Sequence, residues 1–292
     1  MMEFLQLEDL RAAWPYLRHG VGMALIIGAV CPLIGIYFVL RRIVFIGVAI
    51  PQVSSAGIAF AFLSQGMGWF GLLPGATPHM GVALTGSIVF TLIALLSMGL
   101  LLPRGGQAEA VIGLVFVAVS GLSLVLIANA PVAEAGLLNM LKGEIVAVTA
   151  VDLIQAVVFF GLVGGLLLVF NKDFLLLAFD RDLAVTMGKA VAAWDVFFFI
   201  LAGVAVSVAV FNVGPIAGFA FLIVPPLIGL LFSRNMVMLF PLSAAVGIVG
   251  SLAGFFLAFR FDLPAGPAGA VFLGATYAVL AGVKILALRC FR

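Results

Sequence analysis

The stretch "WDVFFFILAGVAVSVAVFNVGPIAGFAFLIVPPLIGLLF", residues 194–232, is an almost unbroken apolar run that is divided only at Asn212–Pro215. About 20 apolar residues are enough for a helix to cross a hydrocarbon core about 30 Å thick. The run is therefore long enough for two crossings, and Gly214–Pro215 marks the place where the helix would break. Whether it forms two crossings or one, the run predicts an integral membrane protein built of helices.

The rest of the chain has the same character. Hydrophobic residues make up 65% of the 292 residues and charged residues only 9%, with a mean hydropathy of +1.36, beyond the range of soluble domains. Seven further spans are expected near residues 19–40, 49–65, 81–102, 110–128, 151–170, 236–258 and 267–288. The sequence thus predicts an all-α polytopic membrane helix bundle with eight or nine transmembrane helices, forming a single domain over residues 1–292.

Basic residues orient this bundle, because short cytoplasmic loops of membrane proteins are enriched in Lys and Arg. With an external N-terminus, nine spans place ten of the fourteen basic residues on the inner side: Arg41, Arg42, Arg104, Lys172, Arg181, Lys189, Arg234, Lys284, Arg289 and Arg292. The remaining four lie outside: Arg11, Arg18, Lys142 and Arg260. We therefore expect residues 1–18 to form an extracytoplasmic or interfacial segment and the C-terminus to be cytoplasmic. The net charge of +2, without a basic cluster, argues against a nucleic-acid partner.

The polar segment at residues 177–191 would then lie in the cytoplasm. Asp180 is a good helix N-cap, Asp182 places an anion in the first turn, and Gly188 is a natural C-terminal stop, so a helix of about two turns is predicted. Apolar residues recur at intervals of four on one side: Phe179, Leu183 and Met187. This side either folds back onto the inner surface of the bundle or docks into a groove of a soluble partner.

Candidates for a path through the membrane lie in "AIPQVSSAGIAFAF", residues 49–62. Pro51 removes a backbone donor, and Gln52 and Ser55 share one helical face with Ser54 nearby. Polar side chains are costly within a membrane, so the long amide of Gln52 is the strongest candidate. Small hydroxyls also hold helices together, so Ser54 and Ser55 fit packing as well as a path.

Pro225 and Pro226 predict a kink deep within the apolar run. Such a kink frees backbone carbonyls, which are tolerated only where protein or water satisfies them. The kink is either a static bend fixed by packing or a moving gate.

Four blocks carry a resemblance to a known family: "VLRRIVFIG" (39–47), "GLLNMLKGEIVAVTAVDL" (136–153), "FDRDLAVTMG" (179–188) and "FDLPAGPAGAVFLG" (261–274). In order and spacing they resemble the ABC-3 family, the permeases of bacterial zinc, manganese and iron importers. The resemblance covers roughly residues 17–285. It identifies residues 177–191 as the cytoplasmic coupling loop, with Ala184 and Gly188 at the spacing found in ABC importer permeases.

The resemblance also implies the partners. It predicts a permease in the bacterial cytoplasmic (inner) membrane that pairs with a second permease chain, in a homodimer or a related pair. Two cytoplasmic ATPase subunits and an extracytoplasmic substrate-binding protein complete the importer, and ATP and Mg belong to the ATPase. This chain contains no G-x-x-x-x-G-K-[ST] phosphate loop, so we expect a transport subunit that binds no cofactor and is not itself an enzyme. The outer mouth would include Glu134, Glu144, Asp152, Arg260 and Asp262.

The chain departs from the family at a position that matters for cargo. The family commonly has Gly-Asp-Ala-Leu-Ser-His where this chain has residues 47–52, so Val48 and Gln52 replace the acidic residue and the histidine. Only two histidines remain, His19 and His79, and we assign no metal-ligating residue. The path passes a metal ion without strong ligands, or it carries a metal chelate or a small organic solute.

Two other classes of function fit less well. An ion-coupled secondary transporter would normally place a carboxylate or histidine in mid-membrane, whereas Asp152 and Asp195 both fall near span ends. An intramembrane enzyme would need catalytic groups that converge inside the bundle, and the sequence offers none.

Overall fold

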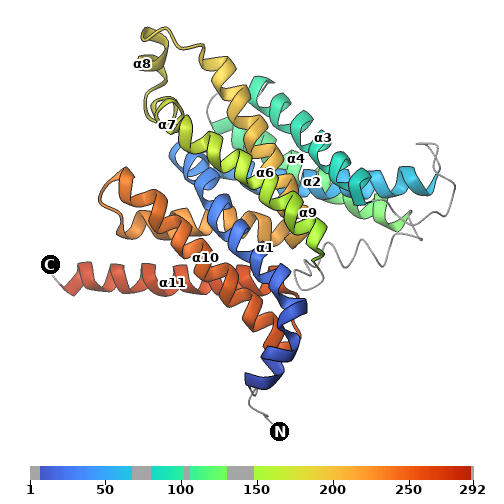
Figure 1. Ribbon diagram of the computed structural model, residues 1–292. Coiled ribbons are helices and arrows are strands. Elements are labelled where there is room, and N and C mark those ends of the chain that lie inside the picture. The colour runs from blue at the N-terminus through green and yellow to red at the C-terminus, as the bar shows by residue number, and fades with distance from the viewer. Residues whose placement is uncertain (1–6, 68–79, 102–105, 130–147, 291–292) are drawn as a thin grey trace.

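The structure is a computed structural model that describes residues 7–67, 80–101, 106–129 and 148–290. Within these ranges the chain consists of helices joined by short connections. The helices are α1 (Leu7–Leu40), α2 (Val44–Gly66), α3 (Met80–Leu101), α4 (Gly106–Ala128), α6 (Ala150–Val169), α7 (Asn171–Phe179), α8 (Arg181–Thr186), α9 (Val191–Phe232), α10 (Met236–Phe261) and α11 (Ala265–Cys290). Figure 1 shows them as one bundle with α7 and α8 at one end. The predicted all-α class is therefore confirmed.

Eight of these helices are long and apolar enough to cross a membrane. One of them, α9, has 42 residues, which corresponds to about 63 Å of helix, or twice the thickness of a hydrocarbon core. Gly214 interrupts it with a φ of 78° and a ψ of 166°. A Cβ on Gly218 would lie only 3.2 Å from the Val210 side chain, although residues eight apart are about 12 Å apart along a straight helix. The helix therefore doubles back at Gly214, and the eight helices supply nine crossing segments.

The first helix begins earlier than the expected span. It runs without interruption from Leu7 to Leu40, and the part that qualifies as a membrane span is Leu17–Leu40. The N-terminal segment that we expected along the interface is thus continuous with the first span over residues 7–18. Its position relative to the membrane stays a prediction.

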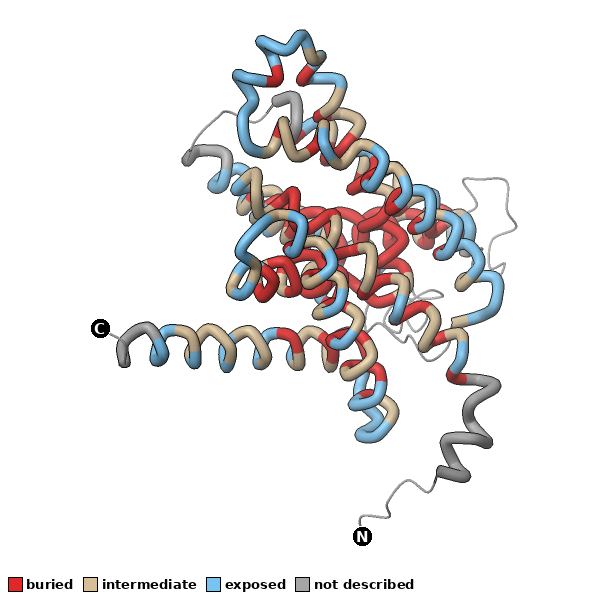
Figure 2. Tube along the Cα trace, turned by 60° about the vertical axis from the view of Figure 1, so that its left-hand side comes forward, coloured by how far each residue is buried: buried red, intermediate tan, exposed pale blue. Residues whose placement is uncertain are grey.

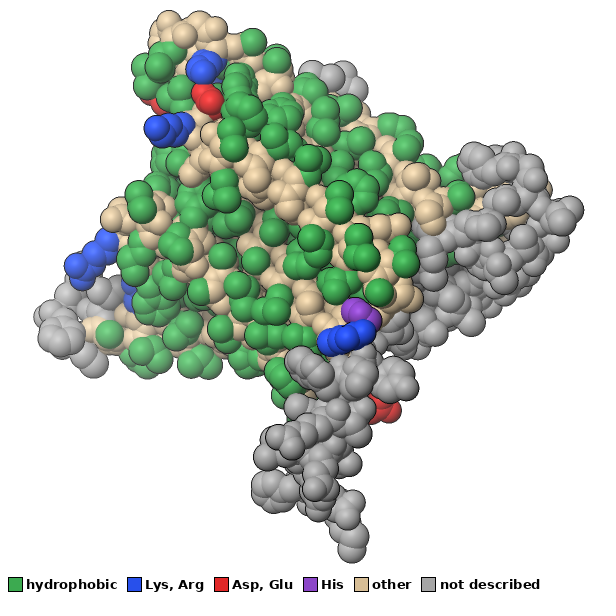
Figure 3. All heavy atoms as spheres, in the orientation of Figure 1, with side chains coloured by type: hydrophobic (Ala, Val, Ile, Leu, Met, Phe, Trp, Pro, Cys, Tyr) green, Lys and Arg blue, Asp and Glu red, His purple; other side chains and the backbone are tan. Residues whose placement is uncertain are grey.

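Burial divides the helices into a central and a peripheral set. α1, α2 and α9 are mostly buried, whereas α4 and α11 are largely exposed. Figure 2 shows the buried residues gathered in the middle of the bundle and α11 extending from it with mostly tan and pale blue residues. The face seen in Figure 3 is predominantly hydrophobic, with charged side chains toward its ends. Such an apolar exterior is what contact with the lipid bilayer or a second membrane chain requires.

Small residues allow the central helices to approach closely. At the crossing of α1 and α10, a Cβ on Gly28 would lie 2.6 Å from the carbonyl oxygen of Gly247. α2 and α3 cross in the same way, since a Cβ on Gly57 would lie 2.6 Å from the carbonyl oxygen of Gly86. Helices in membranes associate largely through such backbone contacts at small residues. α1 and α2 are held in the core by these crossings.

The proline pair of α9 is buried against α1. Pro226 has no N–H, so the carbonyl of Leu222 lacks its usual partner within the helix. Gly35 of α1 covers this carbonyl so closely that a Cβ would lie 1.6 Å from its oxygen. The carbonyl is thus covered by protein, as the packing interpretation of the proline pair requires.

Candidate coupling helix, path and outer mouth

The predicted short helix in the polar segment exists as α8. Asp180 caps it, because its Oδ1 accepts a 2.8 Å hydrogen bond from the backbone N–H of Leu183. Asp182 lies in the first turn, and Gly188 follows the helix with a φ of 74°, a left-handed conformation that glycine adopts without strain. The N-cap and the glycine stop predicted from the sequence are therefore confirmed.

The two sides of α8 have different surroundings. Ala184 is fully buried and packs with Leu177 and Val191, which anchors the helix to α7 and to the start of α9. The prediction that Phe179, Leu183 and Met187 share one side of a single helix is wrong, because Phe179 ends α7, Asp180 after it is extended, and Met187 is the C-cap of α8. All three side chains are nevertheless exposed: Phe179 60%, Leu183 47% and Met187 61%. These apolar side chains therefore do not fold back onto the bundle.

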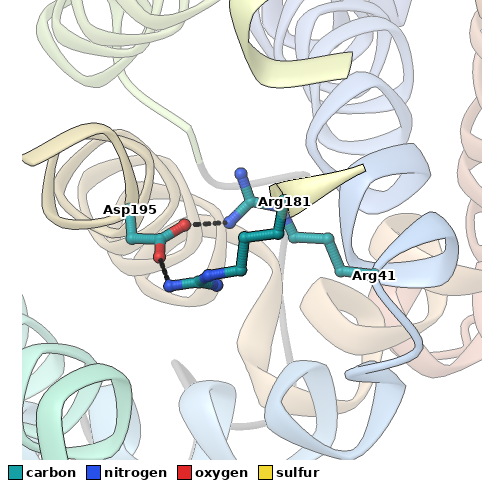
Figure 4. A network of polar contacts seen from close by, with 3 residues as sticks. All are labelled: Arg41, Arg181 and Asp195. Carbon is teal, nitrogen blue, oxygen red and sulfur yellow. Dashed lines mark hydrogen bonds and ion pairs between the residues drawn. The ribbon is translucent and has the colours of Figure 1, made fainter. Parts of the chain in front are cut away.

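A charged network that the sequence did not reveal fixes this end of the molecule. Asp195 of α9 accepts a 3.0 Å hydrogen bond from Arg41 Nη1 through one carboxylate oxygen, and Arg181 pairs with the other oxygen (Figure 4). Nearby, Lys189 Nζ lies 2.7 Å from Asp173 Oδ1. The partners Arg41 and Asp195 are 154 residues apart in the chain, so no local pattern pairs them. The one signal in the sequence was an acidic residue at the start of a long apolar run.

Arg41 is the buried member of this network. Its side chain is 9% exposed, its guanidinium lies 4.4 Å from the centre of the Phe198 ring, and neither Nε nor Nη2 has a partner among the described residues. Burial lowers the pKa of the Arg41 guanidinium, and the neighbouring Asp195 carboxylate opposes that shift. Asp195 is therefore the group that makes a charge at position 41 tolerable.

The path candidates of α2 separate into two kinds. Pro51, Ser54 and Ser55 are buried inside the chain, whereas Gln52 is partly exposed on the same helical face as Val48. Ser54 Oγ lies 2.6 Å from Ser87 Oγ of α3. This contact favours the packing interpretation for Ser54. Gln52 keeps access to the surface of the chain, as a path residue requires.

The two proline candidates, Pro225 and Pro226, are likewise buried, in the second half of α9. A Cβ on Gly47 of α2 would lie 3.1 Å from the Ile223 side chain, so the segment just before the two prolines contacts the N-terminal part of α2 as well as α1. The part of α9 that carries the prolines thus packs against α2, which carries the other path candidates.

The outer-mouth candidates lie at the end of the bundle opposite α8, as far as the structure describes them. Asp152 belongs to the capping box of α6, where its carboxylate accepts hydrogen bonds from the Thr149 N–H and hydroxyl. Arg260 and Asp262 are exposed where α10 turns into α11, and Asp262 has a left-handed φ of 52°. Glu134, Glu144 and His79 fall outside the described residues. Asp152 therefore caps α6, while Arg260 and Asp262 are exposed.

The described residues contain no group of three or more His, Cys, Asp or Glu side chains that could hold a metal ion. Gln52 and Val48 supply at most one amide to the partly exposed face of α2.

Comparisons with known proteins agree with this architecture. The manganese transport system membrane protein MntC of Halalkalibacterium halodurans is 25% identical over 273 residues, covering 94% of this chain and 88% of that protein. The manganese import system permease protein ScaB of Streptococcus gordonii is 28% identical, covering 91% and 89%. The fold resembles a chain of PsaBC from Streptococcus pneumoniae, solved in complex with Fab, with a TM-score of 0.78, 23% identity and coverage of 94% and 95%. The model of the ABC 3 transport family matches residues 13–284, and the chain belongs to that family.

Proposed function

We propose that this chain is the membrane-spanning permease subunit of an ABC importer and that it passes a divalent metal ion, such as manganese, zinc or iron. Family membership and relatives named for manganese transport support this proposal. The observation that carries it is α8, a capped helix in a polar segment, where the apolar side chains of Phe179, Leu183 and Met187 are exposed. An exposed apolar helix face is suited to insertion into a groove of a soluble partner.

Charge supports a cytoplasmic location for α8. Its end of the bundle carries the basic residues Arg41, Arg42, Lys172, Lys189 and Arg234, whereas Arg18 and Arg260 belong to the opposite end. This distribution follows the enrichment of Lys and Arg on the cytoplasmic side. We therefore place the N-terminus outside and the C-terminus in the cytoplasm of a bacterial cell, with the chain in the inner membrane.

The proposed complex contains two permease chains, two ATPase subunits and one extracytoplasmic binding protein. The ATPase holds ATP and Mg and docks on Phe179, Leu183 and Met187. The binding protein meets the opposite end, where Arg260 and Asp262 offer charges of both signs for recognition. In this proposal Glu134 and Glu144, which lie outside the described residues, complete the mouth.

The residues on the partly exposed face of α2 bear on the choice of cargo. Gln52 offers a neutral oxygen, which binds divalent cations weakly, and weak binding within a path permits fast release. The partly exposed Val48 beside it favours a second candidate, a metal chelate that brings its own ligands and needs no charged side chain here. A binding protein that selects its cargo outside the membrane is compatible with both candidates.

The docking proposal is tested with matched variants on the two sides of α8. We expect Leu183→Asp to remove most of the ATPase that co-purifies with the permease, because it places a charge in an apolar contact. Val185→Asp is the control, since Val185 is also exposed, at 59%, but points to another side of the same helix. Undiminished ATPase binding by Leu183→Asp, or equal loss with both variants, contradicts the proposed face.

Transport by the complete complex in liposomes distinguishes the cargo candidates. Uptake of free manganese, zinc or iron ions that needs both ATP and the binding protein supports the metal importer. Uptake of a chelated metal alone supports the second candidate. Uptake without the ATPase subunit, driven by an ion gradient, contradicts the ABC importer altogether.

A further inference from the structure

The carboxylate of Asp195 connects three helices at the α8 end of the bundle. It lies near the start of α9, pairs with Arg41 immediately after α1, and pairs with Arg181 in the first turn of α8. We propose that Asp195 is the positioning residue through which a movement of α8 is passed to α1, with Arg181 as the contact that transmits it. This inference rests on the proposed function, because it assumes that an ATPase moves α8.

The two arginines hold Asp195 in different ways. Arg41 is nearly buried, packs on the Phe198 ring and has two further nitrogens without a partner among the described residues. Separating it from Asp195 would leave an uncompensated buried charge, so this pair stays closed. Arg181 has a side chain that is 51% exposed, so water can replace Asp195 around it. The α1–α9 side of the bridge is therefore fixed, and the α8 side is the one that can be adjusted.

The other inward contacts of α8 end on its immediate neighbours. Ala184 packs on α7 and the start of α9, and the Lys189–Asp173 pair joins the segment after α8 to α7. The bridge through Arg181 and Asp195 extends this attachment to the end of α1. Figure 4 shows the two arginines approaching Asp195 from different elements. Asp195 thus joins the docking segment to a helix of the core.

α1 is suited to pass a movement onward. About one turn before Arg41, Tyr37 begins an aromatic cluster with Phe174 and Phe198 in which ring centres are 5.6 to 5.8 Å apart. Further along α1, Gly35 contacts the backbone of Leu222 in the part of α9 just before Pro225 and Pro226. That part of α9 also contacts α2 at Gly47. A displacement that enters α1 at Arg41 therefore reaches the helices that carry the path candidates.

The test uses the complex of permease, ATPase and binding protein reconstituted in liposomes, and manganese uptake into the liposomes is followed. Arg181→Gln removes the charge, Arg181→Lys keeps it, and Arg234→Gln changes an exposed arginine at the same end that forms no ion pair among the described residues. Three quantities are measured: bound ATPase, stimulation of ATP hydrolysis by the binding protein, and manganese moved per ATP. We expect Arg181→Gln to lower both the stimulation and the manganese per ATP about fivefold, with bound ATPase within about twofold of wild type. Arg181→Lys and Arg234→Gln stay close to wild type in all three.

The outcomes separate this inference from the proposed function. If Arg181→Gln retains the wild-type stimulation, Asp195 transmits nothing through it and the inference is wrong. If the variant loses the ATPase itself, Arg181 is a docking residue and the inference is again wrong. A wild-type chain that binds no ATPase refutes the proposed function and this inference together. Failure of manganese uptake with normal stimulation by the binding protein refutes only the cargo.

Discussion

Gly35→Ala should destabilise the permease strongly, because the space beside Gly35 is occupied by backbone. The added Cβ would lie 1.6 Å from the carbonyl oxygen of Leu222 and 2.7 Å from its carbonyl carbon. Ordinary contact begins at 3.4 Å, so α1 would have to move away from α9 by about 1.8 Å, the difference between these distances. Overpacking of a tight core lowers the free energy of unfolding by about 1–3 kcal/mol. Because the neighbour here is backbone, which cannot move aside as a side chain can, we expect a loss at the upper end of this range.

Thermal unfolding of the purified permease measures this cost. A loss of about 3 kcal/mol corresponds to a fall in Tm of about 6–12 °C, at about 2–4 °C per kcal/mol for chains of this order of size. Gly165→Ala on α6 is the matched control, since beyond the adjoining residues of its own helix no described heavy atom lies within 4 Å of its added Cβ. There alanine gains up to about 1 kcal/mol of helix propensity, so Tm should stay constant or rise. Equal Tm values for the two variants would refute the close contact between α1 and α9.

Three further predictions concern the polar residues. Asp195→Asn should lower the free energy of unfolding by about 3–5 kcal/mol, because it leaves Arg41 buried without a carboxylate. A Tm equal to wild type would contradict the fixed Arg41–Asp195 pair. Ser54→Ala should cost about 1 kcal/mol by removing the hydrogen bond to α3 while leaving uptake intact, and a loss of uptake at unchanged Tm would instead assign Ser54 to the path. Gln52→Leu should alter uptake of zinc, manganese or iron in liposomes more than His79→Ala does; equal and negligible effects would remove Gln52 from the path.

The local features were predictable because they depend on neighbours in the chain. A helix needs length and apolar composition to span a membrane, and the run at residues 194–232 has both. Capping acts over three residues, so the local pattern of Asp180 and Gly188 was sufficient to define α8. The choice between eight and nine spans was not predictable. It depended on whether the chain reverses at Gly214, which is a matter of how its two halves pack.

The order of amino acids alone was thus enough to establish the membrane class, the all-α fold, the capped helix and the motifs that resemble the family. The packing of the helices was needed to show that the apolar side chains at α8 are exposed, that Ser54 pairs with α3, and that Asp195 joins Arg41 to Arg181. In an apolar bundle most side chains pack equally well against any helix face, so composition does not determine which faces meet. Those faces meet where a glycine lets two backbones approach or where a buried charge is paired, and several of these pairings, such as Arg41 with Asp195, join residues more than 150 positions apart.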